Sequence, residues 1–177
     1  FYPRFDREQF DNYIRIFELP EVKKLSQYSM GQKKKFILSF ALATNTRLLF
    51  MDEPTNGMDI PSKSQFRKAM ALGMSDDRSI IISTHQVHDL ENMLDRVLVL
   101  HDNTMMLNES IVRIAEKLEF VHSTSKDDLQ GCIYSAFTPE GFVGVRPNTQ
   151  GIETHVDFEV LFNALINHPQ VFSQLFV

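Results

Sequence analysis

Hydrophobic and polar positions follow a helical period along some stretches of the chain and form short apolar runs along others. Apolar residues three and four positions apart, together with capping and proline signals, predict helices. These helices cover 7–18, a segment beginning at Ser29, 61–74, 86–94, 110–118 and 157–168. Short apolar runs bounded by polar residues predict strands. They lie at 48–51, 79–83, 96–100, 103–108, 119–123, 132–137 and 142–146.

The order of these elements indicates the fold class. Between residues 46 and 118, strands and helices alternate, which is typical of a parallel α/β sheet with right-handed crossovers. We expect the strands at 48–51 and 79–83 to be buried on both faces. The sequence therefore divides into a helical segment at 1–45, an α/β core at 46–118 and a small α+β appendage at 119–177.

Composition and charge narrow the class of protein. Hydrophobic residues make up 43% of the 177, enough for a core, and the formal charge is -5. That charge argues against a nucleic-acid partner. No apolar run approaches the eighteen or so residues that a membrane-spanning helix requires. Cys132 is the single cysteine, which fits a reducing compartment.

Two carboxylates follow the first apolar strand. Asp52 and Glu53 stand side by side before Pro54, at the carboxyl end of the strand, where open α/β sheets bind ligands. Adjacent residues in an extended segment point in different directions, so one acid can hold Mg²⁺ through water while the other orients a water molecule. His85 ends the next strand and could reach the same edge. The alternative is an acidic strand end with a capping histidine.

The helix that begins at Ser29 carries a second candidate site. Ser29 and Gln32 form a capping-box pattern, and Gly31 lies between them. Free amide groups at such a helix start can bind an anion, although a capped helix is common in itself. Lysines at 33–35 occupy the end of the helix dipole that is unfavourable for cations, which indicates an anionic neighbour. His85 and His88 have a metal-like spacing, but a third ligand is missing, so we discount zinc.

In order and spacing, four motifs resemble those of ABC-type ATPases. Residues 28–32, Tyr-Ser-Met-Gly-Gln, resemble the signature motif, and 49–55 resemble a Walker B strand followed by the catalytic glutamate. Residues 56–59 look like the D-loop, and 83–85 look like the switch-histidine motif. The resemblance covers about residues 5 to 118. Its Tyr-Ser-x-Gly form is similar to that of bacterial exporter ATPases, although Tyr28 replaces the usual Leu and Met30 the first Gly.

The resemblance implies a fold and a set of roles. The fold would be a partial P-loop NTPase (RecA-like) core with a parallel sheet and a helical segment, plus the appendage. The cofactors would be ATP and Mg²⁺, and the catalytic residues would be Glu53 and His85. Asp52 would assist the metal. Residues facing the nucleotide of a second ATP-binding domain, or the interface with it, would be Ser29, Gly31, Gln32 and Asp59.

The phosphate-binding loop, Gly-x-x-x-x-Gly-Lys, is absent from these 177 residues, because no glycine stands five positions before another. We therefore expect a C-terminal fragment of an ATP-binding subunit, inactive by itself and prone to self-association through uncovered apolar surface. The expected partners are a membrane-spanning transporter subunit and a second ATP-binding domain, with the protein on the inner face of the cell membrane. Alternatives are a soluble ABC-type ATPase acting on ribosomes or chromosomes, and a non-enzymatic regulatory module.

Overall fold

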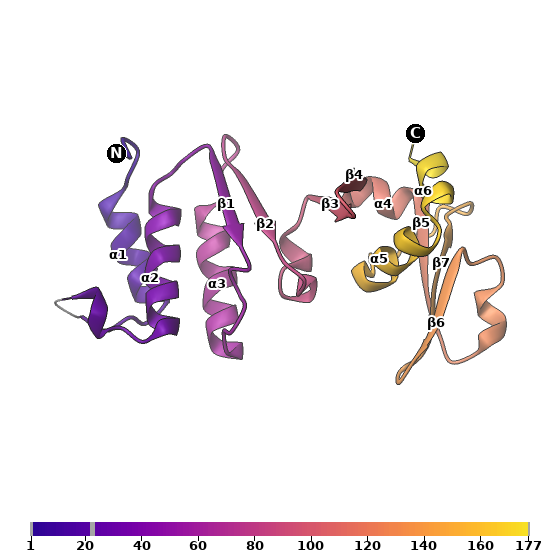
Figure 1. Cartoon of the computed structure of the whole chain (residues 1–177), viewed down its shortest axis with the longest axis horizontal. Helices are drawn as coiled ribbons and strands as arrows, with labels where there is room; N and C mark the ends of the chain where they lie inside the picture. The colour runs from indigo at the N-terminus through magenta and orange to yellow at the C-terminus, as the bar shows by residue number, and fades with distance from the viewer. Residues whose placement is uncertain (1, 22–23, 177) are drawn as a thin grey trace. The chain divides into compact units, whose positions relative to one another are not determined.

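The structure is a computed structural model that describes residues 2–21 and 24–176. The chain forms two compact units, Phe1–Met93 and Leu94–Val177. The first unit combines helices with one two-stranded sheet, and the second combines helices with a two-stranded and a three-stranded sheet (Figure 1). The units are described separately below.

Three helices build most of the first unit. They are α1 (Arg7–Ile16), α2 (Met30–Ala43) and α3 (Ile60–Gly73), and a short 3₁₀ turn, η1 (Leu25–Gln27), precedes α2. Each helix begins where a polar side chain accepts a backbone N–H three residues on, from Asp6, Ser29 and Asp59 respectively. The predicted capping box at Ser29 is confirmed, and α1 ends two residues before the predicted end.

Aromatic and aliphatic side chains fill the space between these helices. Tyr13, Phe17, Leu42 and Phe66 are almost fully buried. Phe40 of α2 is 38% exposed and packs beside the rings of Tyr2 and Phe5. The buried residues of α2 are Leu38, Ser39, Leu42 and Ala43.

Two strands form a parallel sheet in the first unit. β1 (Leu48–Asp52) pairs in register with β2 (Ser79–Ser83), so that Phe50 lies opposite Ile81. The expectation that both faces are buried is wrong, because Phe50 is 67% exposed and Ile81 40%. Within the described residues these strands pair only with each other, so their outer edges are unpaired. The exposed Phe50 and Ile81 side chains show that one face of the sheet is bare.

The segment after β2 does not form the predicted helix over 86–94. It forms two 3₁₀ turns, η2 (Val87–Asp89) and η3 (Glu91–Met93), joined at the buried Leu90, whose backbone is not helical. The Asp89 carboxylate pairs with the Lys63 ammonium of α3 at 2.7 Å. This ion pair and the burial of Leu90 hold the chain against α3 and interrupt a regular helix.

The second unit opens with an antiparallel hairpin. β3 (Arg96–His101) pairs with β4 (Thr104–Ser110), so the prediction that the strand at 96–100 extends the parallel sheet is wrong. Asp102 and Asn103 join the strands with φ angles of 47° and 59°. Two successive left-handed residues match the tight turn that suits the twist of a hairpin. The strand predicted at 103–108 is confirmed as β4.

The rest of the second unit is an α+β arrangement. It contains α4 (Ile111–Lys117), β5 (Leu118–Ser123), the turn η4 (Lys126–Leu129), β6 (Tyr134–Thr138), β7 (Gly141–Pro147), α5 (Phe158–Asn167) and α6 (Pro169–Leu175). The three strands form an antiparallel sheet in the order β5-β7-β6. Helix α6 was not predicted from the sequence. It begins at Pro169, and the Phe172 side chain, which is 1% exposed, packs it against the rest of the unit.

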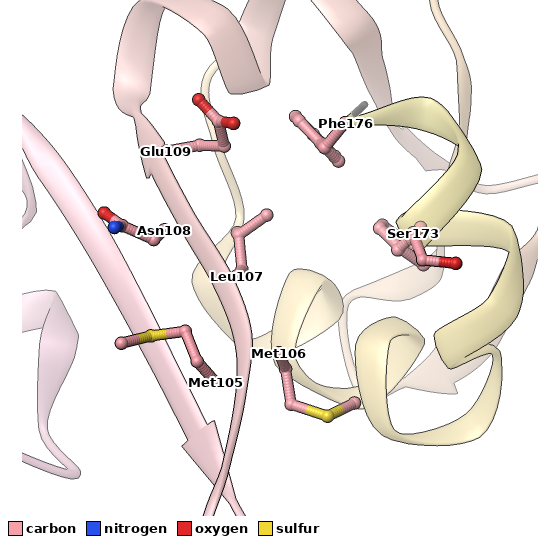
Figure 2. A pocket seen from close by; sticks show the side chains of 8 residues that line it. Met105, Met106, Leu107, Asn108, Glu109, Ser173 and Phe176 are labelled. Carbon is pink, nitrogen blue, oxygen red and sulfur yellow. The ribbon is translucent and has the colours of Figure 1, made fainter.

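A small hollow lies beside α6. It encloses about 250 Å³ between β4 and α6 (Figure 2). Its walls are mostly methionine, leucine and phenylalanine side chains, including Met106, Leu107 and Phe172. Glu109 is the acidic residue of its lining and pairs with Arg113 at 3.7 Å. The hollow contains none of the residues that the sequence motifs single out.

Candidate functional site

The carboxyl ends of β1 and β2 bring the predicted acids and histidine to one edge of the parallel sheet. β1 ends at Asp52, which lies opposite Ser83 of β2, and Glu53 and His85 follow within two residues of the strand ends. Glu53 has a left-handed backbone, with φ of 44°, that turns the chain sharply after the strand. A residue with a Cβ adopts this conformation when its surroundings hold it there.

Glu53 and His85 are in direct contact. The Glu53 Oε1 atom lies 2.6 Å from His85 Nδ1 and accepts the His85 backbone N–H at 3.1 Å. The Thr84 hydroxyl donates to Oε2 at 3.2 Å. These hydrogen bonds, that from the His85 side chain foremost, hold the pKa of the Glu53 carboxyl below its ordinary value. The pair therefore favours an ionised carboxylate beside an imidazole.

The contact leaves the far side of the imidazole open. The His85 side chain is 67% exposed, against 29% for Glu53. If Nδ1 carries the hydrogen donated to Glu53, Nε2 of a neutral ring is an acceptor. With that hydrogen on Nδ1, a donor at Nε2 requires a second proton on the ring.

Asp52 points to a different partner from Glu53. Its carboxylate accepts a short hydrogen bond from the Ser83 hydroxyl and lies at an exposed strand end. Among the described residues, no group of three or more histidine, cysteine or acidic side chains is arranged to hold a metal. An exposed single carboxylate still suits Mg²⁺, which keeps several waters and commonly takes its other ligands from substrate phosphates.

The signature segment forms the start of α2. The Ser29 hydroxyl accepts the Gln32 N–H at 3.2 Å, and the Gln32 side chain accepts the Ser29 N–H at 2.9 Å. The serine O–H remains free to donate. A Cβ built on Gly31 meets nothing within 4 Å, so a ligand can approach the backbone there. Tyr28, in place of the usual leucine, is buried and donates its hydroxyl to the Pro20 carbonyl at 2.9 Å.

Asp59 caps α3. Its carboxylate accepts the Ser62 N–H at 2.9 Å, and hydrogen bonds from Ser62 lower its pKa. The ionised side chain stays exposed at the positive end of the helix dipole. The structure thus places Asp59 on the loop that follows Glu53, away from the direct contact between Glu53 and His85.

Residues to which the sequence analysis gave no role also bind this edge. Ser83 and Thr84 supply hydroxyls to the two acids. Lys34, from α2, donates to the carbonyl oxygens of Glu53 and Asn56, each at 2.8 Å. The lysines at the unfavourable end of the helix dipole were a sequence signal for this contact. For Lys34 the partner is a pair of carbonyl oxygens.

Comparisons with known proteins agree with this geometry. No family model matches the chain. The ABC transporter ATP-binding protein YtrB of Bacillus subtilis is 33% identical over 105 residues, covering 59% of this chain and 36% of that protein. The Nod factor export ATP-binding protein I of Neorhizobium galegae is 30% identical over 156 residues, covering 86% and 41%. Because the match to the Nod factor export protein includes 156 of the 177 residues, it must include part of 119–177.

Solved structures show the same fold. One described as a cobalt-transport ATP-binding protein superposes with a TM-score of 0.54 at 20% identity, over 84% of this chain and 56% of that one. An ATP-binding subunit of an ABC transporter gives a TM-score of 0.54 at 21% identity, over 62% and 48%. At these identities the likeness establishes the fold alone.

Fold, motif order and strand-end geometry define the class: this chain has part of a P-loop NTPase fold. More particularly, the curated relatives that it matches are ATP-binding proteins of the ABC transporter type. The chain spans about two fifths or less of the length of the two curated relatives described above.

Proposed function

We propose that this chain works as part of an energy-coupling subunit in which ATP hydrolysis drives transport across a membrane, in the export direction. The observation that carries the proposal is the contact between Glu53 and His85 at the shared edge of β1 and β2. The printed names of two relatives, a Nod factor export protein and a peptide export protein, SkfE of Bacillus subtilis, favour export.

In this proposal Glu53 is the general base. Its lowered pKa keeps the carboxyl ionised at neutral pH, so it can accept a proton from a water molecule that attacks the terminal phosphorus. His85 Nδ1 holds the carboxylate from one side. As an imidazolium, the same ring would donate from Nε2 to an oxygen of the γ-phosphate. Thr84 fixes the second carboxylate oxygen and so limits rotation of the base.

Asp52 would hold Mg²⁺ through water. The ion supplies neutralisation of charge on the phosphate oxygens when it is bound. The Ser83 hydroxyl orients the Asp52 carboxylate toward the open edge of the sheet.

A second ATP-binding domain would complete the site. Ser29, Gly31 and Gln32 would face the γ-phosphate of ATP held by that domain, and Asp59 would lie at the interface between the two. The exposed Gly31 backbone and the free Ser29 O–H support this role. The helical segment 1–45 would contact a membrane-spanning subunit at the inner face of the membrane.

None of the helices in the described part of the chain has the length and apolarity that crossing a bilayer requires.

The isolated 177 residues should bind nucleotide weakly. Without the glycine-rich loop and its lysine, the β- and γ-phosphates lose their main cradle of amide groups. We expect isothermal calorimetry to give no micromolar binding of MgATP to this chain, and no phosphate release above background. Micromolar binding would overturn this part of the proposal.

The decisive test is Glu53→Gln in a full-length protein that contains these residues. Positioned base catalysis typically contributes about a hundredfold to ten-thousandfold, so turnover should fall by that factor while ATP-dependent dimerisation persists. Glu116→Gln, an exposed change on α4, serves as the matched control and should leave turnover unchanged. Unaltered turnover in Glu53→Gln removes Glu53 from the mechanism.

A further inference from the structure

One lysine connects the start of α2 to the turn that carries Glu53. Lys34 lies in the second turn of α2, and its Nζ atom donates to the carbonyl oxygens of Glu53 and Asn56, at 2.8 Å each. The lysine therefore spans two segments of the first unit that lie far apart in sequence. Its contacts are to the backbone and do not depend on side-chain rotamers at 53 or 56.

The two carbonyls mark the ends of one tight turn. The Asn56 N–H donates to the Glu53 carbonyl at 3.3 Å, so residues 53–56 close on themselves. Glu53 enters this turn with the left-handed φ of 44°. The Glu53 N–H is meanwhile tied to the Ser83 carbonyl of β2 at 2.9 Å. Lys34 thus supplies the restraint on the exit side of the turn, while β2 supplies the restraint on its entry side.

The environment of Lys34 strengthens this link. Partial burial lowers the pKa of its ammonium, against the attraction of the Glu53 carboxylate, so protein acceptors replace part of the group's water. A charged donor bonded to carbonyl oxygens forms stronger hydrogen bonds than a neutral one. The cation also lies in the half of α2 where the helix dipole does not favour it, so these acceptors offset an unfavourable position.

We propose that Lys34 is a positioning residue: it fixes the turn at 53–56 and thereby holds the Glu53 carboxylate against His85. Because Lys34 belongs to the helix that starts at the signature segment, a displacement of that helix moves the base directly. The catalytic effect of Lys34 rests on the proposed function. The contact between Lys34 and the turn at 53–56 does not, because it lies within the 177-residue chain.

The first test uses the chain without nucleotide. Lys34→Met keeps much of the side-chain volume and removes the donor. We expect the nuclear Overhauser contacts between the Glu53 side chain and the His85 ring to weaken, because a released turn lets the carboxylate leave the imidazole. The His85 amide, which donates to Glu53 at 3.1 Å, should exchange its hydrogen about tenfold faster. Lys34→Arg, which retains a charged donor, should restore most of both properties.

Lys33→Met is the matched control, because it removes the neighbouring charge from the same helix and leaves the turn contact intact. Glu53–His85 contacts and a His85 exchange rate that are the same in Lys34→Met as in the unaltered chain would overturn the inference. If Lys34→Met fails to fold, Lys34→Gln takes its place. Its amide can reach one carbonyl, so half-way changes support the inference and unchanged values overturn it.

The second test separates positioning from nucleotide binding. In a full-length protein that contains this chain, Lys34→Met should lower kcat about tenfold to a hundredfold and leave the KM for ATP within about twofold, since small misplacements of a catalytic group have effects of this size. A changed KM with unchanged kcat would contradict a positioning role. The first test needs no ATP, so a negative result there does not contradict the proposed ATPase role. Conversely, a negative result for the ATPase role does not contradict the contact between Lys34 and the turn.

Discussion

The buried guanidinium of Arg78 offers the clearest test of how the first unit is held together. Arg78 is 7% exposed and donates to three backbone carbonyls at the ends of two helices. Nη1 reaches Leu42 at 2.9 Å and Gly73 at 3.1 Å, and Nη2 reaches Ala41 at 3.2 Å. The last turns of α2 and α3 leave such carbonyls without intrahelical partners, and their dipoles favour a cation.

The loss of free energy of unfolding on replacing Arg78 depends on which of the three carbonyls have another hydrogen-bond donor. The Ala41 carbonyl also accepts the Thr44 hydroxyl at 2.6 Å, and the Leu42 carbonyl accepts a longer bond from Asn45 at 3.4 Å. Replacing Arg78 by Met therefore leaves one or two poorly satisfied buried acceptors. A hydrogen bond to a charged group contributes about 1.5–3 kcal/mol, and relief of guanidinium desolvation offsets part of the loss. We expect Arg78→Met to lower the free energy of unfolding by about 3 kcal/mol.

Urea unfolding measures this change. Far-ultraviolet circular dichroism follows the helices, and tyrosine fluorescence reports mainly on the first unit, because three of the four tyrosines lie there. Arg67→Met, an exposed change on α3, is the control and should stay within about 0.5 kcal/mol of the unaltered chain. A loss for Arg78→Met no larger than that of the control would refute the argument that this residue clamps α2 to α3.

Three further outcomes test the second unit and the bare sheet face. Hydrogen bonds from Arg146, at 2.8 Å and 2.5 Å, lower the pKa of Glu119 below its ordinary 4.5. The stabilisation is therefore present above that value and lost as pH falls through the lowered pKa, so Glu119→Gln should flatten the decline in urea midpoint between pH 5 and pH 3. Gly144→Ala should destabilise by about 1–3 kcal/mol in thermal unfolding, because its Cβ would lie 2.8 Å from the Cys132 sulfur. Phe50→Ser should reduce the self-association seen by light scattering, since the ring is 67% exposed on the bare face of β1.

Matched variants make these outcomes decisive. Glu140→Gln, an exposed carboxyl, should leave the acid dependence as it was, and an identical slope in Glu119→Gln would contradict the role of the ion pair. Gly31→Ala meets open space within a helix and should be neutral or stabilising. Phe137→Ser removes an aromatic ring that is 73% exposed elsewhere. Equal effects of Phe137→Ser and Phe50→Ser on association would remove the sheet face from the explanation.

The sequence by itself determined most of the local elements, although not the turns at 87–93 or α6, and the identity of the chemical groups. The capping box at Ser29 needs only residues three positions apart, and the start of α3 near Pro61 needs only one turn of chain. The parallel pairing of β1 with β2 follows from their separation by a helix, and it brings Glu53 to His85. Such features depend on residues that are close in sequence, or on the rule that two strands joined through a helix commonly pair in parallel.

Tertiary structure alone decided which surfaces are covered and which distant groups meet. Phe50 has the sequence of a buried strand, yet its exposure depends on whether another element lies over it. The strand beginning at Arg96 could pair with either neighbour, and the left-handed turn at Asp102 favoured the hairpin. The bond from Lys34 to Glu53 joins positions nineteen residues apart, and its formation depends on how α2 lies against the end of β1. Burial and long-range hydrogen bonding are properties of the packed chain, so local pattern cannot specify them.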